Sequence, residues 1–294
     1  MTGNPPNHAV SLDALLPAEM AARAEQIGVR KAQMRLESTF VLAVLAGAFV
    51  ALGAVFATTV SAGATGALPY GVVRLLAGLV FSLGLILVIV GGAELFTGNT
   101  LIVMAWDHRK VSTRQLLRNW LVVYLGNFVG ALGTALLVFL SGQHAFGKGA
   151  VGLVALDTAA FKVQHTFVEA VALGILCNAL VCLAVWLTFG ARSTTDKIVA
   201  IIFPITAFVA AGFEHSIANM YFIPIALAIR ELAGPEFWTL IGRTPADYPL
   251  VTWAGFFRNL VPVTLGNIIG GGVLVGAVYR LVYLRPRPAA TPAP

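Results

Sequence analysis

The chain has 294 residues, of which 58% are hydrophobic and only 11% charged, with a mean hydropathy of +0.86 and a formal net charge of +6. Water cannot solvate so apolar a chain, so a soluble globular protein is excluded and a membrane protein is indicated. The charges fall almost wholly between the apolar runs. The positive net charge therefore reflects membrane topology, and no basic surface is left over for a nucleic acid.

Residues 1–36 form the only long stretch that looks soluble. They contain no apolar segment before a cleavage site, so we expect no cleaved signal peptide, and the first span should act as the insertion signal. Pro17 stands at a plausible helix start, and Met20, Ala24, Ile27 and Met34 recur at helical spacing. This pattern predicts a short amphipathic helix on the cytoplasmic face, which either docks against its neighbours or forms a gate that a cytoplasmic partner controls.

Six apolar runs follow, at residues 39–62, 72–105, 117–140, 164–188, 197–232 and 254–284. A straight helix crosses a bilayer with about 20 residues, so the second and fifth runs are too long. Each has a polar, glycine-containing interruption near its middle, at 91–99 and at 212–219. The sequence therefore predicts an all-α membrane protein with six transmembrane helices, of which the second and fifth are broken.

Orientation follows from the distribution of Lys and Arg. Of the 19 such residues, 13 lie before the first run, between the second and third, between the fourth and fifth, after the sixth, or inside a run within five residues of one of these segments. This bias places both termini in the cytoplasm. The Pro-rich end, residues 285–294, is predicted to be a disordered cytoplasmic tail, which leaves residues 37–284 as the six-span membrane domain.

The sequence shows no sign of a metal site or a catalytic centre. Cys177 and Cys182 lie five residues apart in one apolar run, point in different directions on a helix, and are interpreted as ordinary small apolar residues. The histidines outside the apolar runs have no metal-ligand spacing, and there is no HExxH, CxxC or P-loop motif. We expect no cofactor, no enzymatic activity and no ATP-driven transport.

The six runs read as two copies of three. Thr39-Phe40-Val41 matches Thr166-Phe167-Val168 at an offset of 127, which sets Arg35 opposite Lys162. Glu94 and Asn99 match Glu214 and Asn219 with the same five-residue gap, and Leu125-Gly126-Asn127 matches Leu265-Gly266-Asn267. Each half has an odd number of spans, so the copies, at about 37–140 and 162–284, insert with opposite orientation.

Broken helices at equivalent positions then meet near the middle of the membrane. Irregular backbone at that depth must be buried in protein or line a watery cavity, so we predict that the permeation path runs between the two interruptions. A plain structural kink in each span is the alternative.

At these residues the chain resembles the formate/nitrite transporter family, from about residue 12 to residue 283. The resemblance is carried by residues 91–97, 125–127, 173–178, 212–220 and 265–272, and residues 15–21, 165–170 and 235–239 most resemble the formate channel branch. The resemblance implies an aquaporin-like protomer with two inverted three-helix repeats, a homopentamer with one pore per protomer, and no prosthetic group. It implies a small monovalent anion as substrate, formate first, with nitrite and hydrosulfide as alternatives.

The resemblance also implies roles for individual residues. It places the central histidine of the family at His215, the loop threonine at Thr97 and the vestibule lysine at Lys162. It places further polar residues of the pathway at Asn178, Glu214, Asn219 and Asn267, and apolar constrictions at Phe81, Leu85, Leu95 and Phe208.

The chemistry of the polar residues fits an anion path. His215 is the one histidine on membrane-embedded sequence, and its ring can donate to a carboxylate when neutral or pair with it when protonated. A satisfied core histidine is the alternative. Glu214 projects about 100° away on a helix, so we expect it to be protonated or paired within the protein. Lys162 either draws anions into a vestibule or is an interfacial lysine.

Two predictions rest more on the resemblance than on the residues. The Thr97 hydroxyl can donate or accept, but Thr100 offers the same chemistry. Large apolar residues in a narrow pore exclude hydrated ions, but the four named above can equally be core or lipid-facing residues.

Taken together, the residues and the family resemblance predict a channel that passes formate in both directions across a bacterial cytoplasmic membrane, outward as the anion and inward with a proton when the outside is acidic. A water or glycerol channel should carry paired Asn-Pro-Ala loops and a pore arginine, and an intramembrane enzyme should carry a second catalytic group. Neither interruption contains these features.

Overall fold

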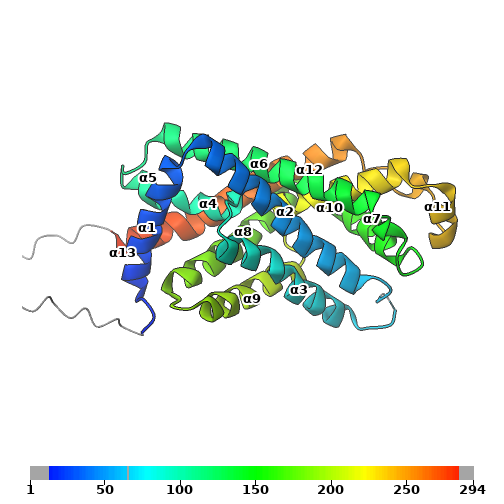
Figure 1. The fold of residues 1–294 in the computed structure, drawn as a ribbon, viewed down its shortest axis with the longest axis horizontal. Coiled ribbons are helices and arrows are strands. Elements are labelled where there is room, and N and C mark those ends of the chain that lie inside the picture. The colour runs from blue at the N-terminus through cyan, green and yellow to red at the C-terminus, as the bar shows by residue number, and fades with distance from the viewer. Residues whose placement is uncertain (1–12, 65, 285–294) are drawn as a thin grey trace, which may run out of the picture.

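The computed structural model describes residues 13–64 and 66–284, and this part of the chain is helical, without β-strands. The predicted disordered tail, residues 285–294, and residues 1–12 lie outside it. Helix α1 (Pro17–Gln33) and the last helix, α13 (Val278–Tyr283), lie at one end of the molecule, and α7 (Ala150–Val163) and α11 (Pro235–Ile241) lie towards the other (Figure 1). The predicted amphipathic helix is therefore present, although Met34 lies just beyond its end.

Within residues 13–64 and 66–284, five helices are long and apolar enough to cross a membrane, or six if a bent pair counts as one span. The five are α2 (Leu36–Ser61), α3 (Tyr70–Gly91), α6 (Thr113–Leu140), α8 (Phe167–Gly190) and the continuous stretch Trp253–Tyr283. That stretch comprises α12 (Trp253–Ile268), a π-helical segment (Ile269–Ala277) and α13. The bent pair is α10 (Ser216–Leu232) with α11, which meet at 112°.

Both predicted breaks are confirmed. The second run leaves helical geometry after α3 and resumes as α4 (Phe96–Asn99), a 3-10 turn (Thr100–Ile102) and α5 (Val103–Asp107). The fifth run consists of α9 (Thr194–Ala210) and α10, each of 17 residues, with residues 211–215 between them. Gly92 (φ 81°) and Gly212 (φ 77°) adopt the left-handed conformation that ends a helix and that side chains with a Cβ rarely tolerate.

The inverted repeat is confirmed, but its predicted register is wrong by one helical turn. The Glu94 amide donates to the Leu42 carbonyl at 3.2 Å, and the Glu214 amide donates to the Leu173 carbonyl at 3.3 Å. Leu42 therefore corresponds to Leu173, an offset of 131 and not 127, and Lys162 corresponds to Lys31 and not to Arg35. A shift of four residues returns a helix to nearly the same face, so residue identities alone could not distinguish the two registers.

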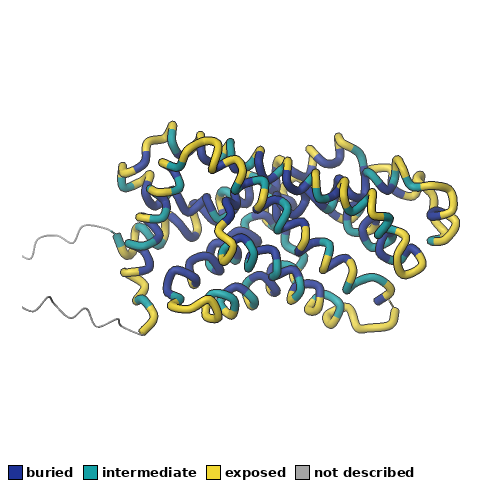
Figure 2. Tube along the Cα trace, viewed as in Figure 1, coloured by how far each residue is buried: buried dark blue, intermediate teal, exposed yellow. Residues whose placement is uncertain are grey.

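Glycines bring the helix pairs of each half into close contact. A Cβ on Gly130 of α6 would overlap the Val44 carbonyl of α2, and a Cβ on Gly270 would overlap the Ile175 carbonyl of α8. Figure 2 shows buried residues through the middle of the bundle and exposed ones on its flanks. On α6 the exposed residues include Leu117, Leu121 and Leu125, one turn apart, and such an apolar stripe suits hydrocarbon or another membrane-embedded chain.

Candidate functional site

The two breaks meet at a contact between Thr97 and His215. Thr97 lies in the first turn of α4 and His215 caps the N-terminus of α10, and their Oγ1 and Nε2 atoms are 3.0 Å apart. The His215 ring stacks on Phe208, with ring centroids 5.8 Å apart. Both polar side chains are buried. The predicted meeting of the two interruptions is therefore present in the fold.

The hydrogen bonds of His215 define its neutral form. The backbone N–H of Ala218 donates to Nδ1 at 3.1 Å, so Nδ1 carries no proton in the neutral ring. The proton then lies on Nε2, which donates to the Thr97 hydroxyl. An N–H and a hydroxyl therefore face each other at the junction of the two half-helices, where the positive ends of α4 and α10 converge.

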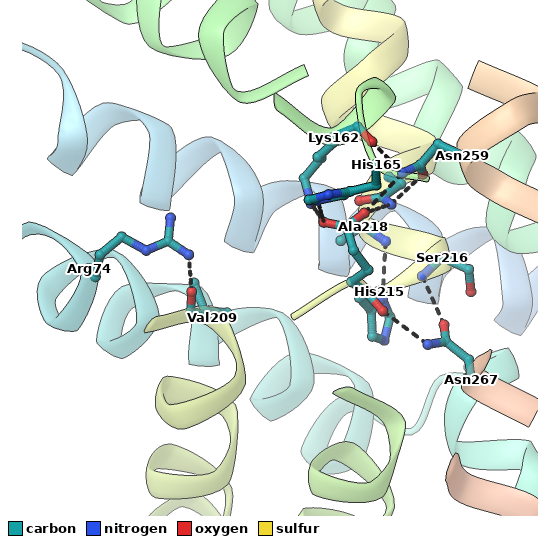
Figure 3. A network of polar contacts seen from close by, with 11 residues as sticks. Arg74, Lys162, His165, Val209, His215, Ser216, Ala218, Asn259 and Asn267 are labelled. Carbon is teal, nitrogen blue, oxygen red and sulfur yellow. Dashed lines mark hydrogen bonds and ion pairs between the residues drawn. The ribbon is translucent and has the colours of Figure 1, made fainter. Parts of the chain in front are cut away.

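Lys162 of α7 holds Glu214, next to His215. The lysine Nζ donates to Glu214 Oε1 at 2.7 Å, and the second carboxylate oxygen accepts from Asn219 at 2.7 Å and from Asn259 at 3.1 Å. Figure 3 shows Lys162, His165 and Asn259 together on one side of the His215 ring. Glu214 is thus paired within the protein, as expected, and its charge is compensated before it can repel an anion.

An equivalent network lies at the other end of the junction, in the first half of the chain. Lys31 of α1 donates to Glu94 Oε1 at 2.7 Å, and Asn99 donates to Glu94 Oε2 at 2.7 Å and to Asn119 at 2.9 Å. The sequence analysis matched Glu94 and Asn99 to their counterparts but did not include them, Lys31, Asn119 or Asn259 among the site residues. The correct register of the repeat would have supplied Lys31, because it pairs that residue with Lys162.

Two asparagines satisfy the irregular backbone of the breaks. Asn127 of α6 accepts from the Phe96 N–H and donates to the Glu94 carbonyl, both at 2.9 Å. In the other half, Asn267 accepts from the Ser216 N–H at 2.9 Å and donates to the Glu214 carbonyl at 3.0 Å. Buried backbone groups without such partners would cost several kcal/mol in a membrane (about 2 to 7 per group).

Two cavities flank the junction. The α7-side cavity, about 660 Å³, is lined by Lys162, Glu214, His215, Phe81 and Phe208, among others. The α1-side cavity, about 290 Å³, is lined by Lys31, Glu94, Leu85, Leu95 and neighbouring residues. The four predicted constriction residues are therefore divided two and two between the cavities, and all four are buried.

The predicted polar residues fall into two groups. His215, Lys162 and Glu214 line the α7-side cavity. Thr97, Asn178, Asn219 and Asn267 line neither of the two cavities. Asn178 donates to the carbonyls of Thr97 at 3.2 Å and Asn267 at 2.6 Å, which ties the first break to α12. Thr100 donates to the Thr97 carbonyl at 2.7 Å, so of the two threonines it is Thr97 that faces His215.

Comparison with known proteins agrees with this geometry. The sequence profile described as "Formate/nitrite transporter" matches residues 18–281. The chain belongs to the formate/nitrite transporter family. Within that family, "Formate channel FocA" of Escherichia coli K12 is 51% identical over 93% of this chain and 96% of its own length, and "Formate channel FocB" of the same organism is 45% identical over 95% and 99%.

Solved structures of this family have the same fold. A chain described as "Pentameric formate channel with formate bound" superposes with a TM-score of 0.81 at 47% identity, covering 85% of this chain and 98% of that one. A second, described as "FNT family ion channel", superposes with a TM-score of 0.73 at 30% identity, covering 92% and 98%. Known members that match this chain are channels and transporters.

Proposed function

We propose that this chain is a channel for formate and related small monovalent anions in a bacterial cytoplasmic membrane, and that it works as a homopentamer with one pore in each protomer. The names of its relatives, and the solved pentameric formate channel of the same fold, support this substrate and this assembly. The excess of Lys and Arg on the α1 side supports cytoplasmic termini. Residues 37–284 form the channel domain, residues 1–36 its cytoplasmic N-terminal region and residues 285–294 its tail.

The observation that carries the proposal is the Thr97–His215 contact between the two cavities. A carboxylate that enters the junction finds the Nε2–H of His215 and the Thr97 hydroxyl as donors, together with the N-terminal ends of α4 and α10. The nearest carboxylates, Glu94 and Glu214, are held by Lys31 and Lys162. Since both carboxylates are already paired with lysines, neither is available to bind a cation at the junction. The junction therefore selects anions.

The remaining pathway residues have separate tasks in this proposal. Phe81 and Phe208 narrow the path on the α7 side, and Leu85 and Leu95 narrow it on the α1 side, which slows hydrated ions. Asn178, Asn219 and Asn267 hold the backbone and the glutamate of the path. Formate leaves the cell as the anion and enters with a proton, which His215 exchanges when the outside is acidic. Because the substrate is not converted, the protein needs no cofactor and is not an enzyme.

The test is the flux of radiolabelled formate into proteoliposomes at external pH 5 and pH 7. Wild type should show saturable formate flux that rises at pH 5, and the rise should be lost in His215→Asn, which keeps a side-chain acceptor for the Ala218 N–H but has no titratable ring. His144→Phe is the matched control, because His144 lines neither cavity and already stacks on Phe139. Faster flux of nitrite or hydrosulfide than of formate, or a pH response that persists without His215, would contradict the proposal.

A further inference from the structure

The two mouths of the path differ in charge, although the networks next to the junction match. The charged residues that line the α1-side cavity are Arg23, Lys31, Lys197 and Glu94, which sum to +2. Those that line the α7-side cavity are Arg74, Lys162, Asp157 and Glu214, which sum to zero. The lysine–glutamate pair is common to both mouths, so the difference arises from the other residues.

The surplus charge of the α1-side cavity lies on Arg23 and Lys197. Arg23 donates to the Phe189 carbonyl at 3.0 Å, at the end of α8, and within residues 13–64 and 66–284 neither cation forms an ion pair. Both side chains are partly exposed at the cavity. They are therefore available to an anion that enters from this side.

The acidic residues close in sequence to these two cations are engaged elsewhere. Glu19, one turn before Arg23, accepts from the Leu16 N–H at 2.8 Å. Glu25 of α1 is buried and binds His108 and Lys110 of the turn between α5 and α6. Asp196, next to Lys197, accepts from the backbone N–H groups of Arg192 and Ser193 at 3.1 and 2.9 Å. None of these carboxylates lines the α1-side cavity.

At the α7-side mouth the charge of Arg74, the other cation that lines the cavity, is offset by that of Asp157. Arg74 donates to the carbonyls of Ala210 and Val209 at the end of α9, apart from the His215 network in Figure 3. Asp157 accepts from the Tyr248 hydroxyl at 3.0 Å. Burial and the neighbouring Asp157 raise the pKa of Tyr248, so its hydroxyl stays protonated and donates to the aspartate.

We propose that Arg23 and Lys197 form an anion-collecting site at the α1-side mouth, for a small carboxylate or an anion of similar size, and that the α7-side mouth has no equivalent. This inference rests on the proposed function. Anions that approach from the α1 side are concentrated before they reach Leu85 and Leu95, whereas anions from the α7 side are not. The channel therefore saturates at a lower formate concentration when formate enters from the α1 side.

The size of the effect follows from Coulomb's law. A unit charge about 8 Å from an anion in water raises the local anion concentration about twofold at low ionic strength, so two such charges raise it about fourfold. Salt near 0.3 M shortens the screening length and removes most of the effect. At low concentration a passive pore has the same permeability in both directions, so the asymmetry is visible in the half-saturating concentration.

The experiment compares right-side-out and inverted membrane vesicles from cells that express the full-length chain. Initial uptake of radiolabelled formate is measured at pH 7 over a range of concentrations, at low ionic strength and at about 0.3 M salt. The test variant is Arg23→Gln/Lys197→Gln. The matched control is Arg30→Gln/Arg114→Gln, which removes two exposed cations from the same face, neither of which lines the cavity.

For wild type we expect a half-saturating concentration about fourfold lower for entry from the α1 side at low salt, and a difference of less than about twofold at high salt. The two values should become equal in the test variant and remain about fourfold apart in the control. Arg23→Lys/Lys197→Arg, which keeps both charges, should retain the difference. This result would show that the loss in the test variant comes from the missing charges and not from misfolding. Equal values in wild type at low salt, or a difference that survives in the test variant, would overturn the inference alone. Absence of any formate uptake by wild type would overturn the proposed function as well.

Discussion

Replacing Lys162 by Met tests whether the two lysine–glutamate pairs differ in energy as their burial predicts. Both pairs have an N···O distance of 2.7 Å. The Glu214 side chain is 1% exposed and that of Lys162 is 11% exposed, whereas the values are 6% for Glu94 and 26% for Lys31. Water therefore reaches the Lys31–Glu94 pair more easily than the Lys162–Glu214 pair.

Removal of one partner leaves an uncompensated charge, and its cost depends on solvent access. For Lys162→Met we expect a loss of about 3 to 5 kcal/mol in the free energy of unfolding, the range for a broken buried pair. For Lys31→Met we expect about 1 to 2 kcal/mol, between the values for exposed and buried pairs. Lys162→Met/Glu214→Gln should recover at least half of the loss, because the amide carries no charge that needs a partner.

The assay is reversible chemical denaturation of the purified protein in mixed micelles, followed by circular dichroism, with all variants in the same micelle composition. The order of stability should be wild type, then Lys31→Met, then Lys162→Met. If Lys31→Met is as destabilised as Lys162→Met, burial does not set the energy of these pairs. If the double variant is no more stable than Lys162→Met, the loss arises from packing and not from an unpaired glutamate.

Two further predictions concern helix packing and the attachment of α1. Gly130→Ala should destabilise the protein by about 1 to 3 kcal/mol, because its Cβ overlaps the Val44 carbonyl, whereas Gly133→Ala, with open space around it, should be neutral or stabilise by about 0.5 to 1 kcal/mol in the same denaturation assay. Equal effects at the two glycines would show that α2 and α6 are not in close contact. Glu25→Gln should weaken the attachment of α1 by about 1 to 3 kcal/mol and so speed limited trypsin cleavage within α1 about fivefold or more. An unchanged cleavage rate would mean that other contacts hold α1.

Much of the fold could be predicted because the bilayer imposes strong rules on sequence. The apolar runs, the amphipathic helix and the two breaks all follow from hydropathy, length and glycine placement. The meeting of the two breaks was predicted for the same reason, because irregular backbone in both halves has to be buried at one place. The family's motif then decided between Thr97 and Thr100, which sequence chemistry alone left open.

The rest depended on the register between helices, which sequence patterns determine poorly. The predicted offset of 127 matched residue types on the correct helix faces, but it shifted α2 against α8 by one turn. This error hid the correspondence of Lys31 and Lys162, and with it the second half of the polar network. Asn119 and Asn259 were missed because each lies on a long apolar helix, where nothing in the local sequence indicates that it contacts an asparagine of the broken helices, Asn99 or Asn219.

The correct register also explains where the two halves are free to differ. Each broken helix needs an asparagine for its backbone and a lysine for its glutamate, because unpaired groups at that depth are costly, so both halves retain the same set. The charged residues that differ between the two mouths are not needed to stabilise a broken helix, so the repeat does not require them to match. They are Arg23, Lys197, Arg74 and Asp157. An inverted repeat therefore makes the two networks that flank the junction nearly symmetric and leaves the mouths as the place where saturation from the two sides can be made unequal.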